Sequence, residues 1–221
     1  MSRIRTLRIA GPAGRLEAVL TVPDGKPVAG AVVCHPHPLF GGTMQSKVVF
    51  RAARALVDQE IVALRFNFRG TGASQGTHDE GRGERDDVRA ALDELAKLYP
   101  GLPLVSGGHS FGAIMALRAG VDDGRVGAMF ALGLPIARMT DTSFLDRCHK
   151  PILFVQGERD ELGSAEAIRA AAARLPDSSS VSIVPSGDHL FNESLDELER
   201  IIGSWAAGRP WRRDGQESRD D

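Results

Sequence analysis

Short apolar runs alternate along the chain with segments of helical periodicity. Six runs rich in aliphatic and β-branched residues, each bounded by Gly, Pro or charge, predict strands over 28–34, 61–68, 102–108, 126–133, 151–155 and 180–184. Apolar residues recurring at i, i+3, i+4 and i+7 predict intervening helices that include 49–56, 88–95, 168–175 and 198–205. This alternation indicates an α/β fold, a mostly parallel central sheet with helices on both faces.

The two ends of the chain differ from this repeating pattern. The first 22 residues, which include LRIAGPAGRLEAVLTV, predict an antiparallel hairpin on the sheet edge. From residue 209 the sequence RPWRRDGQESRDD has dense mixed charge, so we expect a disordered tail over 209–221. With 221 residues in all, we expect a single domain over 1–208. Residues 134–150 are too few for a bulky cap, so we expect an open cleft.

Composition narrows the classes of partner. The chain has 27 basic and 29 acidic residues and a formal net charge of −2, which gives no electrostatic basis for binding nucleic acid or an anionic membrane. No secretory signal or membrane span is recognisable, so the prediction is a cytoplasmic protein with a small-molecule partner. The two cysteines, Cys34 and Cys148, lack CxxC spacing and are expected to be buried thiols. Nothing in the sequence indicates the oligomeric state.

The motif G-x-S-x-G occurs twice, as GASQG (72–76) and GHSFG (108–112). In its catalytic form the serine sits on a sharp turn between a strand and a helix, and the flanking glycines avoid collision with neighbouring backbone. A polar, Gly-rich stretch follows Ser74, which is therefore predicted to be a surface-loop serine. Ser110 follows the strand LPLVS and precedes the helical AIMALRAG, so it is the predicted nucleophile.

A nucleophilic serine needs a base and an acid that orients the base. In α/β-hydrolases these follow in the chain order Ser, Asp or Glu, His. Of the two histidines after the elbow serine, His149 precedes a strand, whereas His189 follows the last strand and is the predicted base. Asp160, in QGERDELG after the strand 151–155, is the predicted acid, with Glu158 and Asp188 as alternatives.

These motifs carry a resemblance to a known family. The elbow GHSFG, the stretch LRFNFRGTGASQG, the loop GERD and the order of the three residues resemble the α/β-hydrolase superfamily. In detail the chain resembles small, nearly lidless bacterial members near dienelactone hydrolase, in the branch that carries an HPHP loop. The resemblance covers about residues 5–207. True dienelactone hydrolases have cysteine where this chain has Ser110, and HPHP replaces the commoner His-Gly oxyanion loop.

The segment CHPHPLFGG (34–42) raises a separate question about its two histidines. In the superfamily this loop supplies one backbone N–H to the oxyanion hole, and the residue after the nucleophile, here Phe111, supplies the other. The prolines that flank His37 have no N–H, so His37 is the expected donor and Leu39 the alternative. His35 is expected to frame the loop through ring-to-backbone hydrogen bonds.

A metal site is the rival interpretation of the histidine pair. An H-x-H pair at a strand end holds zinc or iron in amidohydrolases, and His109 and His189 could supply further ligands. Those enzymes are eight-fold βα barrels, and this chain has about six strands in the repeating pattern. We therefore expect neither a metal nor a cofactor.

The sequence thus predicts a serine hydrolase that cleaves a small carboxylic ester or thioester through an acyl-enzyme. An acyltransferase or metabolic thioesterase, and a non-catalytic interaction module on a hydrolase scaffold, remain alternatives. The candidates to line an apolar acyl pocket are Leu39, Phe40, Phe111, Leu134, Met139, Phe144, Leu190 and Phe191.

Overall fold

A single eight-stranded sheet organises the part of the chain that the computed structural model describes, residues 2–211. The strand order is β1-β2-β4-β3-β5-β6-β7-β8. The strands are β1 (Arg3–Gly11), β2 (Gly14–Val22), β3 (Ala29–Cys34), β4 (Ile61–Phe66), β5 (Leu104–His109), β6 (Val126–Leu132), β7 (Ile152–Gly157) and β8 (Ser180–Val184). Each of the six strands predicted from apolar runs is therefore present.

The predicted hairpin is confirmed as the edge of this sheet. β1 and β2 pair antiparallel around a turn in which Gly11 faces Gly14, and β2 pairs antiparallel with β4. All other pairs, from β4–β3 to β7–β8, are parallel. In β2 the buried Leu16, Ala18 and Leu20 alternate with more exposed residues, as expected for a strand with one covered face.

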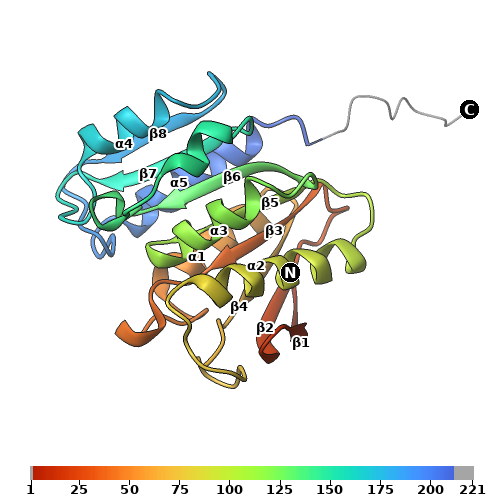
Figure 1. The fold of residues 1–221 in the computed structure, drawn as a ribbon. Coiled ribbons are helices and arrows are strands. Elements are labelled where there is room, and N and C mark those ends of the chain that lie inside the picture. Colours follow the sequence, from red (N-terminus) through yellow and green to blue (C-terminus); the bar gives the residue numbers. More distant parts are fainter. Residues whose placement is uncertain (1, 212–221) are drawn as a thin grey trace, which may run out of the picture.

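Helices cover both faces of the sheet (Figure 1). They are α1 (Lys47–Val57), α2 (Arg82–Leu98), α3 (Phe111–Gly120), α4 (Ala165–Ala172) and α5 (Leu195–Ala207). The buried faces of α1 and α5 belong to one apolar cluster, and those of α2, α3 and α4 belong to the other. The predicted α/β-hydrolase architecture follows from these two cores separated by one sheet.

The segment between β6 and β7 is short, as expected from the sequence. It contains two 3₁₀ helices, η2 (Ile136–Arg138) and η3 (Ser143–Arg147), and no cap. Within residues 2–211, no helix is both long and apolar enough to cross a membrane.

The predicted tail begins with residues that pack on α5. The Arg209 guanidinium lies 4.7 Å from the Trp205 ring centroid, and Trp211 Nε1 donates to the Ala206 carbonyl at 2.8 Å. The rest of the predicted tail, 212–221, lies outside the described residues.

Candidate active site

Ser110 occupies a strained turn directly between β5 and α3. Its φ of 56° and ψ of −121° are unusual for a residue with a side chain. A Cβ on Gly108 would lie 2.7 Å from the Cys34 carbonyl oxygen, and one on Gly112 would lie 2.4 Å from that of His35. Both glycines of GHSFG are therefore needed because the backbone after β3 passes against the turn.

The serine of the second motif has a different environment. Ser74 Oγ donates to the Asn67 carbonyl at 2.7 Å and accepts from the Glu17 amide at 2.9 Å. The residue is buried, so the prediction of a surface serine is wrong. The bond to Glu17 ties the loop after β4 to β2, and the bond to Asn67 closes the loop on itself. The GASQG motif thus belongs to a structural loop.

Ser110, His189 and Asp160 form one hydrogen-bonded chain. His189 Nε2 lies 2.8 Å from Ser110 Oγ, and His189 Nδ1 lies 2.8 Å from Asp160 Oδ2. The Asp160 side chain is fully buried, whereas that of His189 is 20% exposed. The three residues follow β5, β8 and β7, because the carboxyl ends of parallel strands meet at one edge of the sheet.

The alternatives for the acid and the base lie in other contacts. Glu158 Oε2 accepts from the Ser186 amide at 2.8 Å. The Asp188 carboxylate accepts from the backbone and side chain of Asn192 at 3.0 and 2.8 Å. His149 is exposed. Of these candidates, only Asp160 and His189 are joined to Ser110.

Two buried polar residues that the sequence analysis did not assign hold this chain in place. Gln156 Nε2 donates to Asp160 Oδ2 at 2.7 Å and to the Gly163 carbonyl at 2.9 Å. His109 Nε2 donates to the His189 carbonyl at 2.9 Å. The sequence offered a signal for each residue: Gln156 stands in the apolar strand PILFVQG, and His109 stands beside the elbow serine. A buried polar side chain needs a hydrogen-bond partner, so both positions could have been recognised as candidates.

His35 fixes the orientation of one peptide in the HPHP loop. Its Nδ1 donates to the Pro36 carbonyl at 2.6 Å, and its Nε2 accepts from the Phe68 amide at 3.0 Å. The Pro36–His37 peptide is trans, so the His37 N–H points away from the carbonyl that the His35 ring binds. His35 frames the loop as expected, and neither ring nitrogen is free to bind a metal.

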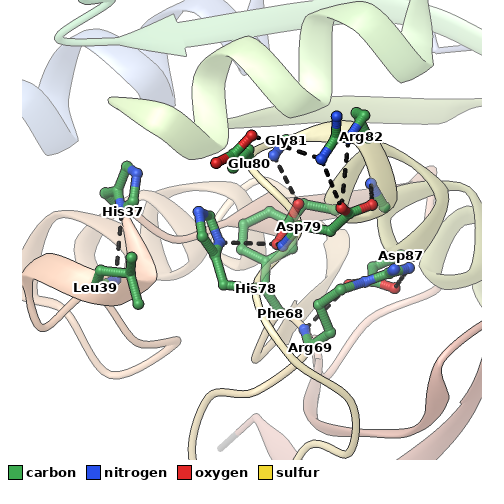
Figure 2. Close-up of polar contacts among 12 residues, drawn as sticks. His37, Leu39, Phe68, Arg69, His78, Asp79, Glu80, Gly81, Arg82 and Asp87 are labelled. Atoms are coloured by element: carbon green, nitrogen blue, oxygen red, sulfur yellow. Dashed lines mark hydrogen bonds and ion pairs between the residues drawn. The ribbon is translucent and has the colours of Figure 1, made fainter.

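The ring of His37 contacts its own loop and its neighbours. Its Nδ1 accepts from the Leu39 amide at 3.3 Å (Figure 2). The ring centroid lies 4.8 Å from those of Phe40 and Phe111 and 4.9 Å from that of His78. Burial lowers the pKa of His37 below 6.5, so the ring is neutral at neutral pH and can accept from Leu39.

Two cavities that share His37 lie around these loops, and we call them the first and the second lobe. The first lobe, of about 470 Å³, is lined by Ser110 and His189 together with residues such as Phe40, Leu162 and Leu190. The second lobe, of about 300 Å³, is lined by His37, His78, Glu80, Phe111, Ile114, Met115, Arg118, Arg138, Met139 and Thr140. His37 lies between the two lobes because it lines both.

The residues expected to line an apolar pocket divide into three groups. Phe40 and Leu190 line the first lobe, and Phe111 and Met139 line the second. Leu39 is 69% exposed and lines neither lobe. The other three are packed in the apolar clusters and belong to the core: Leu134, Phe144 and Phe191.

Both cysteines are buried, as predicted. Burial raises the pKa of Cys34, and the negative charge of Asp87 raises it further, so this thiol stays protonated. Across residues 2–211, no group of three or more His, Cys, Asp or Glu side chains is placed to hold a metal ion.

Comparison with known proteins agrees with this geometry. A model of the alpha/beta hydrolase domain matches residues 31–199. The chain belongs to the alpha/beta hydrolase domain family. This alpha/beta hydrolase is 35% identical over 204 residues to the protein RP471 of Rickettsia prowazekii, in a match that covers 88% of this chain and 85% of the relative.

Two solved structures are similar to this alpha/beta hydrolase over most of their length. A serine hydrolase homologue from Coxiella burnetii has a TM-score of 0.82 and 32% identity, covering 90% of this chain and 96% of that one. XC6422 of Xanthomonas campestris, described as a serine hydrolase without a lid, has a TM-score of 0.83 and 31% identity. The latter match covers 92% of this chain and 93% of that one. The family and its hydrolase relatives support hydrolase activity for this chain.

Proposed function

We propose that this alpha/beta hydrolase is a serine esterase that cleaves a small carboxylic ester or thioester. The observation that carries the proposal is the continuous hydrogen-bonded chain from Ser110 through His189 to the buried Asp160. Ser110 Oγ attacks the carbonyl carbon while His189 Nε2 takes its proton and passes it to the departing alcohol or thiol. Water then attacks the acyl-enzyme with His189 as base, which releases the acid and restores Ser110.

Asp160 orients and stabilises the base in this mechanism. It accepts from Nδ1 of His189, so the neutral ring presents Nε2 without a proton to Ser110. Gln156 donates to the same oxygen, Oδ2, and the Leu162 amide donates to Oδ1 at 2.9 Å. A buried carboxylate with both oxygens hydrogen-bonded keeps the imidazole aligned through the proton transfers.

The oxyanion formed in each step is bound by the amides of Phe111 and His37. Phe111 is the first residue of α3, where amides lack an intrahelical acceptor and the helix dipole is positive. The His37 amide is preferred to that of Leu39, since the Leu39 amide donates to the His37 ring. The hydrogen bond from His35 to Pro36 fixes this donor before substrate arrives.

A serine-directed fluorophosphonate tests the mechanism. We expect stoichiometric label on Ser110, found by peptide mapping, and no label on Ser74, whose hydroxyl is committed to the loop after β4. Ser110→Ala should abolish both the label and the hydrolysis of 4-nitrophenyl acetate. Ser74→Ala is the matched control, because it removes the other motif serine and leaves the Ser110–His189 contact in place. Label on Ser74, or turnover by Ser110→Ala, would contradict the proposal.

A further inference from the structure

The second lobe runs along one stripe of α3 that starts at the proposed oxyanion hole. Phe111, Ile114, Met115 and Arg118 have the spacing i, i+3, i+4 and i+7, which places them on one helix face, and all four line this lobe. Seven residues of α-helix span about 10 Å. A bound chain that leaves the oxyanion hole along this stripe would thus pass apolar side chains before it reaches a guanidinium.

Neither arginine of the second lobe forms an ion pair with a carboxylate among residues 2–211, although the charge of Arg118 acts on the exposed Asp141. Arg118 is half-buried, donates from Nη2 to the backbone carbonyl of Asp141 at 3.2 Å, and lies 5.6 Å from the Phe144 ring centroid. Arg138 is exposed and has no side-chain hydrogen bond or ion pair within residues 2–211. Some other surface arginines are paired, for example Arg125 with Asp93 and Asp123.

The nearby acidic groups are already engaged. Glu80, which also lines the lobe, has an 80% exposed side chain and lies 3.5 Å from Arg82 (Figure 2). The fully buried Glu84 accepts from the amides of Asp79 and Gly81 and lies 2.8 Å from Nδ1 of His78. Asp141, the acidic residue on which the charge of Arg118 acts, is exposed and accepts from the Ser143 amide, so both guanidinium groups can bind an anionic ligand.

The mechanism indicates which part of the substrate enters this lobe. His189 must reach the leaving atom to protonate it, and His189 lines the first lobe together with Ser110. The second lobe is lined by His37 and Phe111, the two proposed oxyanion residues, and by neither Ser110 nor His189. The leaving group therefore belongs in the first lobe and the acyl chain in the second.

We propose that the second lobe is an acyl subsite for a chain that ends in a carboxylate, which Arg118 and Arg138 bind. This inference rests on the proposed esterase function and narrows its substrate class to half esters of dicarboxylic acids. The apolar side chains of Ile114, Met115 and Met139 contact the methylene groups. The charged end remains close to solvent, so its binding weakens as salt screens the guanidinium groups.

The test compares two esters with the same leaving group. One is the 4-nitrophenyl half ester of adipic acid, and the other is 4-nitrophenyl 6-oxoheptanoate, in which a methyl ketone replaces the carboxylate. We expect a larger kcat/KM for the half ester. Arg118→Gln and Arg138→Gln should each reduce this preference about fivefold, mainly by raising KM for the half ester, because each removes a charge that only the half ester can pair with. Raising the ionic strength should reduce the preference of the wild-type enzyme as well.

Arg85→Gln is the matched control. Arg85 is an exposed arginine on α2 that does not line the second lobe, so removing its charge should leave the preference intact. The acetate ester of 4-hydroxybenzoate, compared with phenyl acetate, tests an anionic leaving group, and its kcat/KM should not respond to either arginine.

The outcomes separate the subsite from the esterase function. Hydrolysis of the ketone ester without a preference for the half ester, or a preference that survives both substitutions, overturns the subsite alone. If the arginine substitutions lowered kcat/KM only for the acetate ester of 4-hydroxybenzoate, the arginines would bind the leaving group. That result would also overturn the acyl subsite. Failure to hydrolyse any of these esters, together with absence of fluorophosphonate label on Ser110, contradicts the esterase function itself.

Discussion

His109 donates a hydrogen bond from Nε2 to the backbone carbonyl of His189 across 2.9 Å. The residue before the proposed nucleophile thereby holds the backbone of the proposed base. His109 is buried, and its other ring nitrogen, Nδ1, has no hydrogen-bond partner among residues 2–211. Burial lowers its pKa to about 4, so the ring is neutral at the pH at which His189 must accept a proton.

Removing this donor should affect catalysis. We expect His109→Phe to lower kcat for 4-nitrophenyl acetate about tenfold or more, because small displacements of a catalytic group are costly. His109→Gln keeps an N–H donor and should recover part of the loss. His149→Phe is the control, since His149 is exposed and remote from the Ser110–His189 contact. Equal kcat for His109→Phe and wild type would contradict this role.

The two buried histidines, His35 and His109, should make the free energy of unfolding depend on pH. Burial lowers the pKa of His35 and of His109 from 6.5 to about 4. Between these values the unfolded chain binds protons that the folded chain does not, so the free energy of unfolding falls as the pH falls from 6.5 towards 4. Each histidine contributes a slope of up to about 1.4 kcal/mol per pH unit.

Urea unfolding from pH 7.5 to 4.5 measures this slope. The His109→Gln variant should give a shallower dependence than wild type by up to the contribution of one histidine. His149→Gln is the control, because it removes an exposed imidazole and leaves both buried histidines in place. Parallel curves for wild type and His109→Gln would show that His109 is protonated equally in the folded and unfolded chains.

The two histidines of the HPHP loop should respond differently to truncation. His37 is proposed to act through its backbone amide, so we expect His37→Ala to reduce kcat only a few-fold. His35→Ala removes the ring that fixes the Pro36–His37 peptide and should cost about tenfold or more in kcat. His189→Ala should cost about 10⁴-fold, since it removes the proton acceptor.

Circular dichroism should show that all three alanine variants remain folded, and EDTA should leave wild-type turnover unchanged. If His37→Ala were as damaging as His189→Ala, or if EDTA abolished turnover reversibly, the histidine pair would itself be catalytic. If His35→Ala retained full kcat, the loop would not depend on the hydrogen bond to Pro36.

Gln156 should affect catalysis because it positions Asp160. Gln156→Met removes the donor to Asp160 Oδ2 and also leaves the Leu134 amide and the Gly163 carbonyl without their side-chain partner. We expect kcat to fall about tenfold and the protein to be destabilised by about 1–3 kcal/mol, measured by steady-state kinetics and urea unfolding. Gln156→Glu keeps the size but places a second carboxyl beside Asp160, so the ratio of its kcat to that of wild type should rise as the pH falls and the added carboxyl is protonated. A kcat for Gln156→Met equal to wild type would show that Asp160 is positioned without Gln156.

The buried ion pair between Arg69 and Asp87 should contribute strongly to stability. Asp87 on α2 is fully buried and accepts from the backbone amide, Nε and Nη2 of Arg69, at 3.0, 3.0 and 2.7 Å (Figure 2). Asp87→Ala leaves the Arg69 charge unpaired and should cost about 3–5 kcal/mol in urea unfolding. The neighbouring Asp86→Ala breaks only a solvent-exposed pair with Arg89 and should cost less than about 1 kcal/mol. Similar losses in the two variants would contradict this difference.

The local patterns of the sequence were sufficient to predict the strands and helices and to select the candidate catalytic residues. Strands, helix stripes and the edge hairpin depend on the periodicity of apolar residues, which is a property of neighbours in the chain. The elbow could be recognised because GHSFG lies between a strand and a helix, and Asp160 and His189 could be selected because each follows a predicted strand. Ser74 was misjudged as a surface residue because one of its partners, Glu17, lies on β2, remote from it in the sequence.

Contacts between distant segments were decided only by the tertiary structure. Three such contacts depend on where loops after different strands meet. They are the hydrogen bond from Gln156 to Asp160, the peptide orientation set by His35, and the hydrogen bond from His109 to His189. The cleft likewise forms from segments that are remote in sequence, such as α3 and η2, whose arginines line one lobe. The sequence by itself determined the period of each element and the chemistry at each strand end, because these are local. Which side chains touch depends on strand order and packing, and only the assembled sheet specifies those.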